Sequence, residues 1–194
     1  MKTQNDLPLF QLEIDDDIEG TGLIAISLVK NPAIQVPFFK FSENIQLSTD
    51  DRQIVTGAVL IPNQLIYRNE PYPCNVKFSP DQVEEIVQRF HKTGNNNKVT
   101  LEHALSIQGA DIMNLWLSDE QMGIQPPRGF ESLPDKTLFA SYKINDASLW
   151  NSIKSGEFTG FSLEGFFNML PIKMSRELNE FEILKQMKEI FDEY

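Results

Sequence analysis

The chain has 194 residues, of which 41% are hydrophobic and 23% are charged. This balance is typical of a globular protein with a single core, and it excludes a fibrous chain or one disordered throughout. The formal net charge of −11 disfavours direct binding to nucleic acid, because an acidic surface repels phosphates. With one cysteine and two histidines, the chain is expected to have neither an internal disulfide nor a zinc site of Cys and His ligands.

The N-terminal half favours strands with one helix between them. No apolar run approaches the ~20 residues of a membrane helix, and the N-terminus lacks the apolar stretch of a secretory signal. Strands are predicted at residues 7–14, 36–41, 54–60 and 65–67, and residues 23–29 are apolar enough for a buried strand or a short helix. A helix is predicted from Ser79, because Ser79 and Gln82 form a capping box and Pro80 suits the first helical position. Its predicted buried stripe consists of Val83, Ile86, Val87 and Phe90.

The C-terminal half continues with strands around a long loop. Strands are predicted at residues 98–103, 111–117, 137–144 and 158–170, and residues 122–135 are predicted to form a loop because they contain three prolines and two glycines. Asp146 is expected to cap a short helix that ends at Gly156, and residues 175–194 to form one amphipathic helix. The predicted fold class is α+β, with mostly antiparallel strands, two internal helices and a C-terminal amphipathic helix.

Two motifs that can indicate function have simpler structural interpretations. Gly20–Ala25 matches the dinucleotide pattern G-x-G-x-x-A, but three aspartates precede it and would oppose a pyrophosphate, so we interpret it as a turn. His91 lies in the last turn of the predicted helix, where a cationic side chain complements the helix dipole. A catalytic role is therefore not needed to explain His91.

Three residues remain as candidates for chemistry. His103 ends a predicted strand, where catalytic groups are often displayed, although an ordinary histidine at the rim of a sheet would look the same. Ser162 and Glu164 alternate onto one face of a predicted strand, about 6.6 Å apart. A nucleophilic serine with a charged neighbour would have this pattern, and so would a solvated sheet face.

Two blocks, Asn95–His103 and Trp150–Phe167, together resemble the XkdF-type phage prohead proteases. Gly22–Phe41 is similar to the N-terminal part of that family, so the resemblance covers roughly residues 7–170. These proteins are grouped with other capsid-maturation serine proteases, among them the herpesvirus assemblins. The resemblance implies a compact β-barrel-like core with peripheral helices. The expected organisation is a protease-like domain over residues 1–172, followed at 173–194 by the C-terminal amphipathic helix, which would dock on the domain or tether the enzyme.

The resemblance also implies catalytic roles, with Ser162 as the nucleophile and His103 as the general base, on neighbouring strands. Family members often have an acidic residue directly after this histidine, whereas this chain has Ala104, which leaves the third catalytic member open. Glu164 is the first choice, because it shares the face of Ser162, and Asp111 is the second. Glu102 ranks lower as the third catalytic member. The oxyanion hole cannot be located from the sequence; its candidate donors are the backbone N–H groups around Ser162 and the loop that contains Arg128.

The partners follow from the same resemblance. The implied substrates are scaffold and major capsid proteins, and the protease itself, inside the procapsid in the host cytoplasm. No cofactor, metal, nucleic acid or membrane is expected to take part, and self-association is left open. The alternative is a non-enzymatic virion or assembly protein on the same fold, in which Ser162 and His103 are structural residues.

Overall fold

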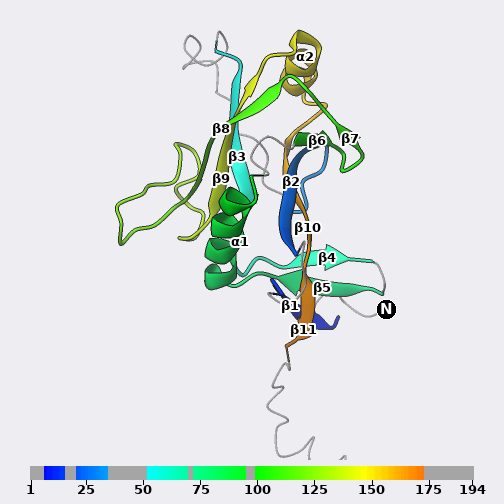
Figure 1. The fold of residues 1–194 in the computed structure, drawn as a ribbon, viewed down its shortest axis with the longest axis vertical. Coiled ribbons are helices and arrows are strands. Elements are labelled where there is room, and N and C mark those ends of the chain that lie inside the picture. Colours follow the sequence, from blue (N-terminus) through cyan, green and yellow to red (C-terminus); the bar gives the residue numbers. More distant parts are fainter. Residues whose placement is uncertain (1–6, 16–20, 35–51, 70–71, 95–98, 173–194) are drawn as a thin grey trace, which may run out of the picture.

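The computed structural model describes residues 7–15, 21–34, 52–69, 72–94 and 99–172. In these residues the strands form three sheets (Figure 1). Sheet A has the order β11 (Asn168–Pro171), β1 (Leu9–Glu13), β5 (Cys74–Lys77) and β4 (Ile66–Arg68). Sheet B has the order β10 (Gly160–Phe166), β2 (Gly22–Val29), β6 (Val99–Leu101) and β7 (Leu105–Ser106). Sheet C consists of β3 (Ile54–Leu60), β9 (Leu138–Ile144) and β8 (Ala110–Leu117).

The α+β prediction is confirmed, but the sheets do not close into a barrel. Most strand pairs are antiparallel; β1–β5 and β2–β6 are parallel. One predicted strand, residues 158–170, divides into β10 and β11, which belong to different sheets. Strand β5 was not predicted. The segments predicted at residues 36–41 and 175–194, and with them the proposed C-terminal helix, lie outside the described residues.

Both internal helices begin where their capping residues predict, and α2 also ends at the predicted glycine. In α1 (Pro80–Lys92) the Ser79 side chain accepts a hydrogen bond from the Gln82 amide, and the predicted stripe is buried. In α2 (Ala147–Ser155) Asp146 accepts from the Leu149 amide, and Gly156 ends the helix with a φ of 82°. No helix in the described part of the chain is long and apolar enough to cross a membrane.

The core lies between one face of sheet B and sheet C, which form two layers in Figure 1. Ile26, Leu28 and Phe161 point from sheet B into this core and are fully buried. The Phe161 ring packs on the Tyr142 ring of β9 with centroids 5.0 Å apart. Because side chains alternate along a strand, Ser27 and Ser162 lie on the opposite face of sheet B.

Gly165 keeps β10 close to β2 at the bulge that follows Glu164. A Cβ atom at this position would overlap the Gly22 carbonyl oxygen and lie 2.8 Å from the Phe167 ring. We therefore expect Gly165→Ala to reduce the free energy of unfolding by about 2 kcal/mol or more, as measured by urea denaturation. Gly123→Ala is the comparison: Gly123 has open space around it but a positive φ of 73°, which Gly165 does not have, so this variant measures backbone strain without steric overlap. Equal losses in the two variants would contradict this prediction.

Candidate active site

A cleft of about 530 Å³ opens beside β10. Strands β2, β4 and β10 line it, together with the segments that follow β2 and β6. Its lining residues are Ile24, Asn31, Ala33, Arg68, His103, Ser162, Leu163, Glu164, Gly165 and Phe166. The three residues singled out from the sequence, His103, Ser162 and Glu164, therefore border one cavity.

A row of hydroxyl side chains crosses sheet B at this cleft. Ser162 of β10 is in register with Ser27 of β2, and Ser27 is in register with Thr100 of β6. Residues in register on adjacent strands share a face, so the three hydroxyl groups lie on the side away from the core. Ser27 Oγ and Thr100 Oγ1 both donate hydrogen bonds to Glu164 Oε1.

These contacts keep Glu164 ionised. Burial alone would raise the pKa of this carboxyl, but the hydrogen bonds from Ser27 and Thr100 and the nearby His103 outweigh it. The net effect lowers the pKa of Glu164 below its ordinary value of 4.5. A carboxylate is therefore present in the cleft at neutral pH.

His103 reaches the cleft from a tight turn between β6 and β7. The turn is closed by the Ala104 amide, which donates to the Leu101 carbonyl at 3.0 Å. Glu102 and His103 both have positive φ, 50° and 58°. Non-glycine residues rarely adopt this conformation, and such strained residues cluster at functional sites. The imidazole Nδ1 lies 3.2 Å from Ser27 Oγ and 3.4 Å from Glu164 Oε1.

The hydrogen-bond directions assign the tautomer of His103. A hydroxyl group has one hydrogen to donate, and Ser27 gives its hydrogen to Glu164. Ser27 Oγ can then only accept from His103, which requires a hydrogen on Nδ1. In the neutral imidazole Nε2 is consequently unprotonated and able to accept a proton, which is the tautomer a serine protease requires.

The prediction that Ser162 and His103 lie on neighbouring strands is wrong, because β2 lies between β10 and β6. His103 itself lies in the turn after β6 rather than in the strand. No hydrogen bond joins Ser162 to His103 among the described residues, although the two side chains line the same cleft. The imidazole lies near Ser27 of β2, the register partner of Ser162, so it extends from the end of β6 toward β10.

Exposure distinguishes Ser27 from Ser162. Ser27 has a relative exposure of 0%, whereas Ser162 retains 8% and lines the cleft. A substrate carbonyl can approach only the hydroxyl that faces the cavity. Ser162 is therefore the nucleophile candidate, and Ser27 is a residue that positions Glu164 and His103.

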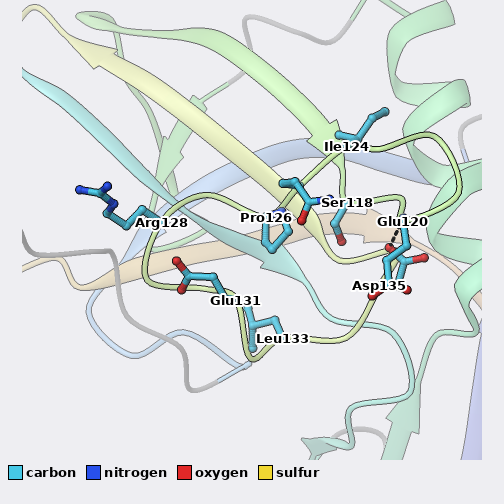
Figure 2. A pocket seen from close by; sticks show the side chains of 9 residues that line it. Ser118, Glu120, Ile124, Pro126, Arg128, Glu131, Leu133 and Asp135 are labelled. Atoms are coloured by element: carbon cyan, nitrogen blue, oxygen red, sulfur yellow. Dashed lines mark hydrogen bonds between the residues drawn. The ribbon is translucent and has the colours of Figure 1, made fainter.

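The other predicted candidates lie elsewhere. Asp111 belongs to β8 of sheet C, where its carboxylate accepts a hydrogen bond from Asn145 at 2.6 Å. Glu102 accepts from the Lys30 amide at 2.6 Å. Arg128 lines a second pocket, of about 380 Å³, on the loop between β8 and β9 (Figure 2). None of the three residues borders the cleft that contains Ser162.

Three further residues belong to the site and were not predicted: Arg68 lines the cleft, and Ser27 and Thr100 bond to Glu164 behind it. Ser27 carried a signal, because it is a polar residue inside a strongly apolar run and buried hydroxyl groups need partners. Thr100 and Arg68 carried none, since a threonine or an arginine near the end of a strand is common on any protein surface. Only the pairing of β2 with β6 and the position of β4 bring them to the site.

Acidification tests the ionisation of Glu164. A carboxyl whose folded pKa is lowered contributes stability above its unfolded pKa and loses it as the pH falls through the folded pKa. We therefore expect the stability difference between the wild type and Glu164→Gln to be largest near neutral pH and to shrink below about pH 4.5. Urea unfolding of both proteins across this range measures it. A difference that stays constant down to pH 3 would contradict the assignment.

No group of three or more metal-binding side chains occurs within the described ranges.

In comparisons with known proteins, a family model described as "Putative phage serine protease XkdF" matches residues 42–170, more than half of the chain. No curated protein and no solved structure matches the chain significantly. The matched range contains His103, Ser162 and Glu164.

Proposed function

Since the chain belongs to the phage serine protease family described by the XkdF model, we propose that it is a serine endopeptidase acting in capsid maturation. In this proposal Ser162 is the nucleophile, His103 the general base and Glu164 the carboxylate that orients the imidazole. The observation that supports it most strongly is the contact of Glu164 and Ser27 with His103 Nδ1, which leaves Nε2 free to accept a proton.

The reaction would follow from these positions. Ser162 Oγ attacks the peptide carbonyl carbon while its proton passes to His103 Nε2. The tetrahedral intermediate collapses with cleavage of the C–N bond, and the imidazolium returns the proton to the leaving amine. Water then attacks the acyl-enzyme, His103 takes a proton from that water, and hydrolysis regenerates Ser162. Glu164 stabilises the imidazolium in both halves of the reaction.

For proton transfer the His103 side chain must move toward Ser162. The β6–β7 turn places the imidazole at the exposed rim of the sheet, where 44% of its side chain is accessible. Catalytic hydrogen bonds are often long in the absence of substrate and shorten in the complex. A peptide in the cleft would exclude water between the two side chains and favour this closure.

The proposed substrates are the scaffold and major capsid proteins of the phage, and the protease itself, inside the procapsid in the host cytoplasm. Confinement in a shell raises the effective concentration of substrate, so a slow enzyme suffices. The test is to assemble procapsids with the wild type or with Ser162→Ala and to map new N-termini by mass spectrometry. Cleavage of the scaffold only with the wild type is the expected result.

The absence of a hydrogen bond between Ser162 and His103 among the described residues favours one second candidate. In that candidate the chain is an assembly protein without catalytic activity, and Ser162 and His103 are structural. It predicts that procapsids form normally with Ser162→Ala and that no scaffold fragments arise with either protein. Fragments that depend on Ser162 exclude it.

A further inference from the structure

Arg68 is a cation in the cleft that has no assigned role. It ends β4, one of the two edge strands of sheet A, so it reaches the cleft from a different sheet than Ser162 and Glu164. In the part of the chain that the structure describes, no carboxylate forms an ion pair with it. Arg68 is an exposed residue at the cleft wall, and partial burial of its guanidinium lowers its pKa below the ordinary value. It nevertheless remains charged at neutral pH.

Arg68 lines the cleft and has no carboxylate partner among the described residues, so an anion that enters the cleft beside it can form an ion pair with it. The only acidic residue among the described residues of the cleft wall is Glu164, whose Oε1 already accepts from Ser27 and Thr100. The remaining wall is largely apolar, with Ile24, Leu163 and an exposed Phe166. The cleft therefore suits a peptide that has an acidic side chain among apolar neighbours.

We propose that Arg68 is a specificity residue that binds the carboxylate of a substrate glutamate or aspartate close to the scissile bond. The proposal rests on the protease function proposed above, because it assigns a substrate preference to that same cleft. A guanidinium pairs with a carboxylate through two parallel hydrogen bonds, which lysine cannot make. The wall from Ser162 to Phe166 spans about 13 Å at a rise of ~3.3 Å per residue, enough for about four residues of extended peptide.

Selectivity of this kind matters for a protein with a net charge of −11. Its overall field repels acidic polypeptides, so acidic segments would be recognised only where a cation acts locally. The contact would also be sensitive to ionic strength, because one face of the cleft is open to solvent. Arg68 would thus choose among peptides rather than attract them from a distance.

Binding to Ser162→Ala tests the proposal without turnover. Overlapping peptides of the scaffold protein are measured by fluorescence anisotropy, and each acidic residue of a binding peptide is replaced by its amide. At one position the amide should weaken binding about 10- to 100-fold. In Ser162→Ala/Arg68→Gln this ratio should fall to about one, and Arg68→Lys should recover only part of it. With Arg68→Glu, a lysine at that position should be preferred instead.

Arg128→Gln is the matched control, because Arg128 lines the second pocket (Figure 2) and its removal should leave the ratio unchanged. Thermal unfolding of each variant verifies that it is folded. A preference for the acidic residue that survives in Arg68→Gln, or the absence of any acid-to-amide preference, would overturn the proposal.

Parallel cleavage assays with proteins that retain Ser162 distinguish the proposed role of Arg68 from the proposed protease function. Cleavage without a charge preference overturns the role of Arg68 and leaves the protease function standing. Charge-dependent binding without cleavage by the wild type supports the carboxylate site and overturns the protease function.

Discussion

Replacing Ser162 with alanine is expected to lower kcat/KM for a scaffold-derived peptide by about 10⁴-fold or more, because Ser162 carries the only hydroxyl side chain among the described residues that line the cleft. His103→Ala should have a similar effect. The double variant should be no worse than either single variant, since the nucleophile and its base act as one unit. Steady-state cleavage of a fluorogenic peptide measures all three proteins.

Two controls make this result specific. His91→Ala should cleave at the wild-type rate, because His91 lies in the last turn of α1 and does not border the cleft. Ser27→Ala should retain a measurable part of the activity, since Ser27 is fully buried and acts through Glu164 and His103. If Ser27→Ala abolished cleavage while Ser162→Ala did not, the nucleophile assignment would be wrong.

The second large effect is expected from Glu164→Gln, which keeps the shape of the side chain and removes its charge. We expect kcat to fall by about 10³- to 10⁴-fold with little change in KM, since the carboxylate acts on the imidazole rather than on the substrate. A glutamine amide that donates to Nδ1 would also favour the wrong tautomer of His103.

Glu102→Gln and Asp111→Asn are the matched controls for this variant. Glu102 is adjacent to His103 in the chain, but its carboxylate accepts from the Lys30 amide. Asp111 bonds to Asn145 on sheet C. Both variants should cleave at nearly the wild-type rate. Wild-type turnover by a folded Glu164→Gln protein would eliminate Glu164 as the third member.

Local sequence patterns were sufficient to predict most of the helices and strands. The capping residues Ser79 and Asp146 predicted the starts of α1 and α2, because a side chain that satisfies free amide groups acts within one turn. Alternation along β10 predicted that Ser162 and Glu164 share a face, since the period of a strand is set by its own backbone. β5 was missed because its four residues are too few to establish a period.

The sequence by itself thus determined the secondary-structure class, the residue types available for catalysis and the shared face of Ser162 and Glu164. Only the tertiary structure decided that β2 separates β10 from β6, that Ser27 and Thr100 bond to Glu164, and that Arg68 borders the cleft. The physical reason is the range of the interactions. Thr100 and Glu164 are 64 positions apart, and contacts between such distant residues depend on strand order and register, which no local pattern encodes.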